Sequence, residues 1–303
     1  MKVLLFGVTG QVGRALVPAL QALGEVHAPR RGDPGGDLSR PEEAAALVDA
    51  WRPAIVVNAA AYTAVDRAES EPALAEAVNA RAPGAIAQAA ARCGAWLVHY
   101  STDYVFDGSG RAPWREADPP APLSVYGRTK LAGEQAIVQA HPRHLILRTS
   151  WVHGPVGGNF IRTMLRLAAE RDRLDVVDDQ VGAPTGAPLI AQVTVAALRR
   201  LQSEPSLAGL YHLSAAGETS WHGYARFVLE HARSRGVVLR AGPEAVHPLP
   251  TSGYPTPARR PLNSRLDTAR LRAAFGLVLP PWQEGVRQTV HGGAKCGYSG
   301  LCM

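Results

Sequence analysis

The stretch Lys2-Val-Leu-Leu-Phe-Gly-Val-Thr-Gly-Gln-Val-Gly13 decides the fold class of this 303-residue chain. Its apolar start predicts a buried strand over residues 3–6, and a helical pattern follows over residues 12–23. A strand, a glycine-rich turn and a helix in this order are typical of a dinucleotide-binding fold. The glycines allow the backbone to approach a diphosphate at the helix N-terminus. Because the first glycine gap is one residue longer than in the commonest fingerprint, a plain strand-to-helix turn stays an alternative.

Strand and helix patterns alternate through the rest of the first half, which is typical of a parallel sheet with right-handed crossovers. Predicted strands cover residues 3–6, 25–28, 54–58, 96–101 and 144–148, and predicted helices cover 12–23, 41–51, 71–93, 126–139, 160–171, 188–201 and 221–234. We therefore predict an α/β fold with a Rossmann-type, doubly wound parallel sheet in residues 1–150. Residues 151–290 are predicted to form a smaller, mainly substrate-binding lobe, with some segments returning to the sheet, and residues 291–303 a disordered or non-native tail.

A tyrosine and a lysine four residues apart suggest chemistry at the edge of this sheet. In a helix, Tyr126 and Lys130 share one face. A nearby ammonium group is expected to lower the pKa of the phenol from about 10, so that it can exchange a proton with a substrate oxygen. The pair alone is a weak signal. However, the glycine turn, the loop at residues 58–63 and Ser101-Thr102-Asp103 all follow predicted strands, where open parallel sheets bind ligands.

Composition and charge exclude several classes of protein. With 46% hydrophobic and 19% charged residues, the chain is expected to be an ordinary soluble globular protein. No stretch approaches the roughly 20 apolar residues that span a bilayer, so we expect no membrane contact and a cytoplasmic location. The net charge is +6, but no basic tract suits nucleic acid. Cys93, Cys296 and Cys302 form no Cys-x-x-Cys pair, which argues against a zinc site.

The chain resembles the extended short-chain dehydrogenases/reductases and, among them, the dTDP-4-dehydrorhamnose reductase family. The resemblance covers residues 1 to about 290 and is carried by residues 4–13, 57–61, 98–106, 126–134, 148–151, 179–185 and 260–264. It implies reduction of the 4-keto group of a dTDP-linked 6-deoxy-hexulose, dTDP-4-dehydro-L-rhamnose, to dTDP-L-rhamnose by a reduced nicotinamide cofactor. In this resemblance Tyr126 donates the proton, Lys130 lowers its pKa and binds the nicotinamide ribose, and Thr102 bonds near the keto oxygen. Asp103 and Trp151 match substrate-contacting positions.

The resemblance also implies the cofactor contacts. These residues are Gly7, Gly10, Gln11, Val12, Gly13, Arg30, Arg31, Asp37, Leu38, Ala60, Ala61, Thr63, Tyr100, Tyr126 and Lys130. At the end of the second predicted strand, Arg30 and Arg31 stand where a carboxylate would bind a ribose diol, and arginine instead accommodates a 2′-phosphate. We therefore predict NADPH as the preferred cofactor, with NADH possible. The alternative is that both guanidinium groups only face solvent.

Differences from related families restrict which activity and which kind of dimer we expect. Sugar-nucleotide 4,6-dehydratases carry Thr-Asp-Glu where this chain has Thr102-Asp103-Tyr104, so the glutamate for water elimination is absent. A magnesium-bridged dimer is doubtful because Ala187 and Pro188 replace the family's glutamate and offer no side-chain oxygen, so we predict no metal. Another homodimer is compatible with the sequence. The alternatives are a reductase or epimerase of another nucleotide-linked keto-sugar, or a non-catalytic NADP-binding regulatory subunit. No Gly-x-Ser-x-Gly elbow supports a hydrolase.

Overall fold

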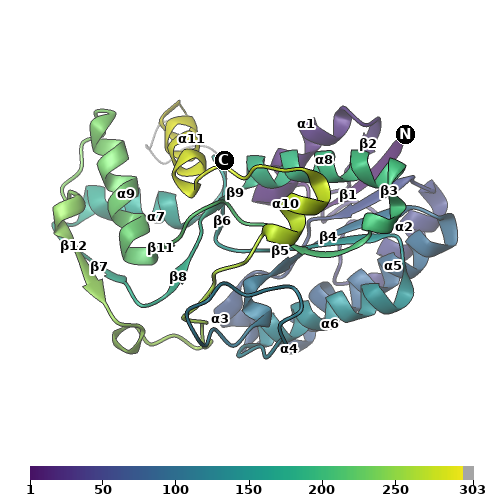
Figure 1. The fold of residues 1–303 in the computed structure, drawn as a ribbon, viewed down its shortest axis with the longest axis horizontal. Helices are drawn as coiled ribbons and strands as arrows, with labels where there is room; N and C mark the ends of the chain where they lie inside the picture. The colour runs from purple at the N-terminus through teal and green to yellow at the C-terminus, as the bar shows by residue number, and fades with distance from the viewer. Residues whose placement is uncertain (296–303) are drawn as a thin grey trace.

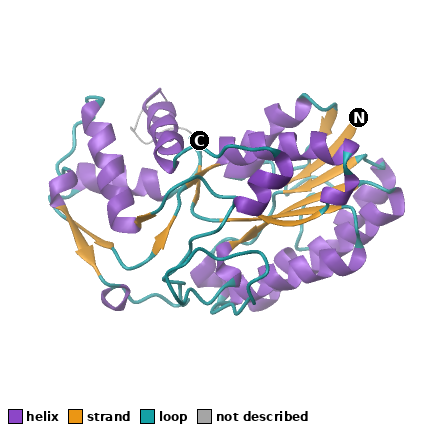
Figure 2. Cartoon of the chain, viewed as in Figure 1, coloured by secondary structure: helices purple, strands orange, loops and turns teal. Residues whose placement is uncertain are grey.

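The computed structural model describes residues 1–295, and its largest feature is a parallel sheet of six strands (Figures 1 and 2). Its order is β10-β5-β4-β3-β1-β2. The strands are β1 Lys2–Phe6, β2 Glu25–His27, β3 Ile55–Asn58, β4 Trp96–Thr102, β5 His144–Thr149 and β10 Gly209–His212. The sheet confirms the predicted doubly wound α/β class. The five strands predicted for the first half all form, each within one residue of its predicted ends.

Helices cover both faces of this sheet because successive strand residues point to opposite sides. Val3 and Leu5 of β1 pack on one face with α1 Gln11–Gln21, α8 Ala187–Ser203 and α10 Ala269–Phe275. Leu4 and Phe6 pack on the other side with α2 Pro41–Trp51, α5 Ala82–Cys93 and α6 Val125–Ala140. We call the packed side chains on both faces of the sheet the first apolar cluster. Because its strands are buried on both faces, β1, β3 and β5 read as apolar runs in the sequence.

The helix predicted over residues 71–93 is interrupted by a wider turn. It consists of α4 Pro72–Glu76, a π-helical turn η1 Ala77–Arg81, and α5, while α3 Val65–Ala68 precedes it. Pro83 explains the turn, because proline lacks an N–H for the carbonyl of Asn79 and would clash with it in a regular helix. The wider turn also brings the Asn79 carbonyl close to α6, where a Cβ on Gly133 would lie 2.1 Å from that oxygen.

A second apolar cluster lies beside the sheet and consists of later segments. It combines α7 Phe160–Glu170, α9 Trp221–Ser234 and α11 Trp282–Lys295 with β7 Leu174–Val177 and β12 Val246–Leu249, at the left of Figure 1. Short paired strands connect this region to the sheet: β6 Val152–His153 with β9 Thr185–Gly186, and β8 Val181–Gly182 with β11 Thr219–Ser220. The short 3₁₀ turns are η2 Asp103–Val105, η3 Pro205–Leu207, η4 Pro243–Ala245 and η5 Thr251–Gly253.

The later half of the chain is therefore not confined to one region. Strand β10 and helices α8 and α10 return to the sheet, whereas α7, α9 and α11 form the second cluster. Helix α11 continues to Lys295, so the tail predicted from His291 begins no earlier than Cys296. Residues 296–303 lie outside the described residues. Among the helices of residues 1–295, none combines the length and the apolar character that a membrane span requires.

Candidate active site

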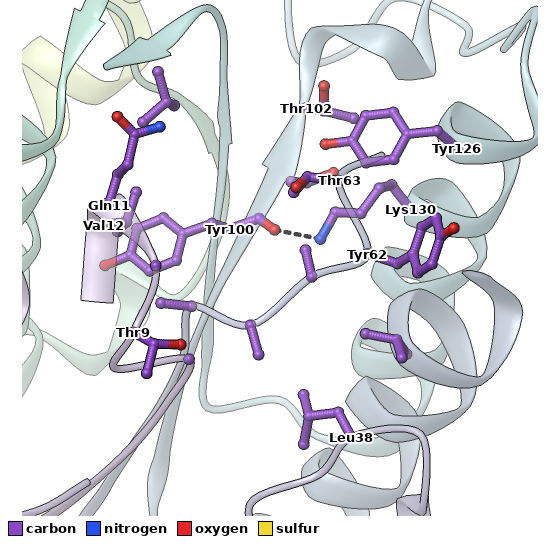
Figure 3. Close-up of a pocket in the computed structure, with 18 of the residues that line it drawn as sticks. Thr9, Gln11, Val12, Leu38, Tyr62, Thr63, Tyr100, Thr102, Tyr126 and Lys130 are labelled. Atoms are coloured by element: carbon purple, nitrogen blue, oxygen red, sulfur yellow. Dashed lines mark hydrogen bonds between the residues drawn. The ribbon is translucent and has the colours of Figure 1, made fainter. Parts of the chain in front are cut away.

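A cavity of about 710 Å³ lies where β1, β3, β4 and β5 end. Figure 3 shows part of its lining, with the turn after β1 on one side and α6 on the other. Of the residues predicted as site residues, those lining it are Gly7, Gly10, Gln11, Val12, Arg30, Arg31, Asp37, Leu38, Ala60, Ala61, Thr63, Tyr100, Thr102, Asp103, Tyr126, Lys130 and Trp151. Gly13 alone is not part of this lining. The structure therefore brings together three parts of the chain that the sequence places at separate strand ends.

The turn after β1 depends on two glycines for different reasons. Gly7 has φ +82°, and a Cβ there would lie 2.4 Å from the backbone nitrogen of Ala60. A Cβ on Gly13 would lie 2.0 Å from the carbonyl oxygen of Gly7, so Gly13 permits α1 to pack against the turn. Gly10 caps α1 without a side chain, and the first helical turn carries no acidic residue. The first N–H groups of α1 thus stay available to an anion such as a diphosphate.

The loop after β2 brings two arginines to the other end of the cavity. The Arg31 Nε lies 3.3 Å from the Asp37 carboxylate, and the backbone N–H of Ser39 donates to the other oxygen at 3.0 Å. Burial raises the pKa of Asp37, but the hydrogen bonds from Ser39 and Arg31 outweigh it and hold the pKa below its usual value. Arg31 is 73% exposed, so its guanidinium can still meet a charged group that enters from solvent.

Tyr126 and Lys130 reach the cavity from the first turns of α6, which Ser124 caps by accepting from the Gly127 N–H. Burial raises the pKa of Tyr126 to about 12, and the nearby Thr102 hydroxyl offsets part of this. The sequence predicts the opposite direction, with Lys130 lowering this pKa. In the structure the side-chain nitrogen of Lys130 instead donates to the Tyr100 carbonyl at 2.6 Å (Figure 3). Tyr126 is therefore held in its protonated form.

Lys130 is itself an unusual lysine because it is only 1% exposed. Burial lowers its pKa to about 8, although the charge of Glu134 acts in the opposite direction. Besides the Tyr100 carbonyl, its nitrogen contacts Nε2 of His99 at 3.1 Å. The Tyr100 hydroxyl points elsewhere and bonds the Thr194 hydroxyl at 2.8 Å.

Asp103 supplies a buried carboxyl group to the same cavity. Its Oδ1 accepts a hydrogen bond from the Thr102 hydroxyl at 3.1 Å, while Oδ2 is buried without a partner. Burial raises the pKa of Asp103 to about 6, and the nearby hydroxyl groups of Ser264 and Thr102 limit the rise. A buried oxygen that has no protein partner is a ready acceptor for a ligand hydroxyl.

Trp151 follows β5 and occupies a strained backbone position, with φ +47°. Its ring stacks on Trp221 of α9 with centroids 3.8 Å apart. On its edge, a Cβ at Gly182 would come within 2.9 Å of the ring. A non-glycine residue with such a φ is uncommon and persists only where its surroundings fix it. The ring is therefore held between α9 and β8, at the boundary of the two apolar clusters.

The cavity also includes residues that the sequence did not single out. They include Thr9, Tyr62, Arg67, Glu71, Tyr104 and Trp221. Tyr62 donates to Glu71, which also accepts from Arg67 at 2.6 Å. Tyr62 lies in the loop at residues 58–63 and Tyr104 in the motif at residues 98–106, so their neighbours in the sequence indicate the site. Trp221 has no such signal, because only the fold brings the start of α9 to this cavity.

The structure offers no protein cage for a metal ion within residues 1–295, where no group of three His, Cys, Asp or Glu side chains is placed to hold one. Ala187 and Pro188, the residues that argue against a magnesium bridge, form the first turn of α8.

Comparisons with known proteins identify the family of this chain. The family model described as "RmlD substrate binding domain" matches residues 1–294. The dTDP-4-dehydrorhamnose reductase of Escherichia coli (strain K12) is 53% identical over 296 residues, which cover 96% of this chain and 97% of that protein. A crystal structure of a dTDP-4-dehydrorhamnose reductase from Clostridium acetobutylicum has a TM-score of 0.86 at 34% identity and covers 96% of this chain and 99% of its own.

A second solved structure carries a cofactor. The dTDP-4-dehydrorhamnose reductase from Bacillus anthracis, in complex with NADP, has a TM-score of 0.85 at 34% identity and covers 95% of this chain and 98% of its own. These matches extend over nearly the whole chain and agree with the resemblance carried by its motifs. The chain therefore belongs to the dTDP-4-dehydrorhamnose reductase family.

Proposed function

We propose that the protein reduces the 4-keto group of dTDP-4-dehydro-L-rhamnose with NADPH and releases dTDP-L-rhamnose, the final step of dTDP-L-rhamnose biosynthesis. One observation carries this proposal above the others. The proton donor expected for a reductase, Tyr126, lines the same cavity as the glycine turn at the N-terminus of α1. Family membership supplies the substrate, and the cavity supplies groups suited to the reaction.

The residues of the cavity fit a dinucleotide. The absence of a side chain at Gly7 lets the turn lie directly against the Ala60 backbone, and the N-terminus of α1 presents free N–H groups. At the far end, Arg30 and Arg31 would meet the 2′-phosphate of NADPH, while Leu38 and Asp37 would border the adenine. We propose NADPH as the preferred cofactor, with NADH accepted less well. Bound NADPH supplies the hydride.

The chain itself supplies the proton and the orientation. With a pKa of about 12, Tyr126 is protonated near neutral pH and can donate to an oxygen that becomes an alkoxide. We assign Thr102 to hydrogen-bond near the same oxygen, because its side chain lies beside that of Tyr126 in the cavity (Figure 3). Lys130 adds positive charge beside the phenol when it is protonated, which stabilises the phenolate left after proton transfer.

We assign the sugar nucleotide to the side of the cavity formed by Asp103 and Trp151. The partnerless Oδ2 of Asp103 can accept from a sugar hydroxyl, and the Trp151 ring offers a flat apolar surface. The second apolar cluster, within residues 151–290, then acts as the substrate-binding lobe. We also propose a cytoplasmic location and, if the protein dimerises, an interface without a magnesium bridge.

Turnover of the purified protein tests the proposal. We expect oxidation of NADPH, followed by its near-ultraviolet absorbance, when dTDP-4-dehydro-L-rhamnose is added, with dTDP-L-rhamnose as the product. Tyr126→Phe is expected to lower kcat by roughly 10²- to 10⁴-fold while NADPH still binds, because only the proton donor is lost. Tight NADPH binding without turnover of this sugar by the wild type would favour another keto-sugar or a regulatory role.

A further inference from the structure

A chain of buried hydrogen bonds connects the loop after β3 to Lys130. It starts at the Ala60 N–H, which donates to Oδ1 of Asn58 at 3.1 Å. This contact fixes the orientation of the Asn58 amide, because an N–H can donate only to the oxygen. The Asn58 NH₂ group therefore points to the other side. The register of β3 against β4 pairs Asn58 with His99.

The orientation of Asn58 determines where His99 carries its proton. The Asn58 Nδ2 lies 3.2 Å from Nδ1 of His99. Burial lowers the pKa of His99 well below its usual value, so the ring is neutral and has a single N–H. Since Asn58 donates, Nδ1 must accept and the proton must be on Nε2. That Nε2–H faces the nitrogen of Lys130 at 3.1 Å.

Only an uncharged Lys130 satisfies every contact in this chain. A neutral amine has a lone pair that accepts from the His99 Nε2–H and still donates to the Tyr100 carbonyl at 2.6 Å. An ammonium has three donors and no acceptor, so its N–H would oppose that of His99. If the His99 proton moves to Nδ1, the contact with Lys130 is relieved, but the Nδ1–H then faces the NH₂ group of Asn58, which is also a donor. If the Asn58 amide turns over to accept this proton, its NH₂ group faces the Ala60 N–H, and two donors oppose each other there.

We propose that His99 is a positioning residue of the reductase: held by Asn58 as the Nε2–H tautomer, it donates to Lys130 and favours the uncharged amine in the protein without ligands. Proton uptake by Lys130 then requires His99 to change its tautomer and Asn58 to weaken its contact with the Ala59–Ala60 backbone. That backbone lines the cavity beside the glycine turn. The protonation of Lys130 is thus coupled to the loop where the cofactor is expected to bind.

The surroundings of Lys130 agree with this assignment. Lys130, His99 and Asn58 are each no more than 1% exposed, so water cannot replace an unsatisfied contact. Burial already lowers the pKa of Lys130 to about 8. Glu134 of α6 and His99 of β4 interact with Lys130, and the titratable groups Tyr126 of α6 and Asp103 of η2 line the same cavity as Lys130. Glu134 is the one that opposes the effect, and Arg148 holds it in a bidentate pair at 2.9 and 2.7 Å.

The chain offers a direct measurement, because its only lysines are Lys2, Lys130 and Lys295. Labelling lysine with ¹³C at Cε gives one NMR signal for each, and Lys2→Arg and Lys295→Arg assign them. In the ligand-free protein we expect Lys130 to titrate below pH 8, the value to which burial alone brings it, and a ¹⁵N correlation spectrum to show the His99 proton on Nε2. A Lys130 that titrates with the other two lysines, or a His99 proton on Nδ1, would overturn the proposal.

Two variants change the chain in different ways. His99→Leu removes the donor to Lys130, and Asn58→Asp replaces the NH₂ group by an oxygen that accepts from His99 Nδ1, so that Nε2 faces Lys130 as an acceptor. Both are expected to raise the pH at which Lys130 titrates by about one unit, the size of one hydrogen bond that changes sign. Asn58→Asp preserves side-chain size and tests the chain if His99→Leu does not fold. Because the new carboxylate also raises the pKa of Lys130 by its charge, the ¹⁵N spectrum of this variant must show the His99 proton on Nδ1, and a proton still on Nε2 would overturn the proposal. His153→Leu removes another buried histidine and is expected to leave the titration of Lys130 unchanged.

The pH profile of turnover separates this inference from the proposed function, on which its catalytic part rests. If the reaction requires the ammonium form of Lys130, kcat/KM falls above the pH where Lys130 titrates, and Asn58→Asp moves that limb upward by the same amount. If the NMR titration of Lys130 moves in this variant but the decrease of kcat/KM stays at the same pH, the proposed role of the Lys130 ammonium in the reaction is overturned. Absence of turnover in the wild type contradicts only the proposed function, since the titration needs no substrate.

Discussion

The two halves of the cavity are built by different means. The half assigned to the cofactor is made of backbone from consecutive strand ends, where Gly7, Gly13 and Ala60 approach within distances that no Cβ allows. The half assigned to the substrate is made of side chains held by contacts across the sequence. Trp151 stacks on Trp221, a residue that lies 70 positions later in the sequence. The first half depends on small residues at fixed spacing, whereas the second depends on the whole fold.

This difference has a practical consequence for mutations. Changes in the first half should affect NADPH binding and packing of α1, because backbone cannot move away from a new Cβ. Changes in the second half should affect the sugar nucleotide more than the cofactor. Four variants test this separation, in order of expected effect.

Gly13→Ala is expected to have the largest effect. The new Cβ would lie 2.0 Å from the Gly7 carbonyl oxygen, so α1 must shift away from the turn. We expect NADPH affinity to fall by more than roughly 100-fold and the free energy of unfolding by roughly 1–3 kcal/mol. Fluorescence titration and chemical unfolding measure these. Gly32→Ala is the matched control, since no atom lies within 4 Å of its Cβ. Wild-type NADPH binding by Gly13→Ala would contradict the assignment of this half.

Trp151→Ala tests the other half. Loss of the stacked ring is expected to raise KM for the sugar nucleotide by roughly 10- to 100-fold, while the Kd of NADPH changes by less than about twofold. Steady-state kinetics and NADPH titration give the two values. Trp151→Asn distinguishes loss of the ring from strain in the backbone, because asparagine lacks the ring but tolerates a φ of +47° better than alanine. We expect the same KM but higher stability for the asparagine variant. Equal losses of sugar and cofactor binding would break the comparison.

Asp103→Asn tests the buried carboxyl group through pH. The folded pKa of about 6 lies above the usual aspartate pKa of 3.8, so the folded protein binds more protons between these two pH values. Wild-type stability therefore falls as pH rises from about 4 to 6, and the variant lacks this loss. We expect the variant to be more stable above pH 6 by roughly 3 kcal/mol, but equal below about pH 4. Chemical unfolding across pH measures the difference. A gain independent of pH would exclude the buried charge as its cause.

Arg31→Ala should have the smallest effect. We expect the preference for NADPH over NADH, as a ratio of kcat/KM values, to fall by roughly three- to tenfold, because a 2′-phosphate loses one cation. Stability should change by less than about 0.5 kcal/mol, since the Arg31–Asp37 pair is exposed. Arg40→Ala removes the comparable exposed pair with Glu43 and should leave the preference unchanged. The same preference in both variants would mean that Arg31 only faces solvent.

Much of the site could be predicted from short stretches of sequence. Apart from Gly13, every predicted site residue lines one cavity, although the individual roles stay predictions. Gly13 shows why a motif can mark a residue without giving its role, because it supports α1 against Gly7 rather than facing the cavity. The π-helical turn at Ala77–Arg81 was not predicted, since alanine-rich segments read as one regular helix. Trp221 could not be predicted at all, because nothing near it in sequence indicates a site.

The sequence by itself determined the strand–turn–helix order and the shared face of Tyr126 and Lys130. Glycine conformation, strand alternation and the helical repeat act within a few residues, so they can be read without the fold. Only the tertiary structure decided the electrostatics. The pKa of Tyr126 rises rather than falls because burial by distant segments outweighs a lysine four residues away, and Lys130 turns to His99 and the Tyr100 carbonyl. Desolvation depends on everything that surrounds a group, and no local spacing records it.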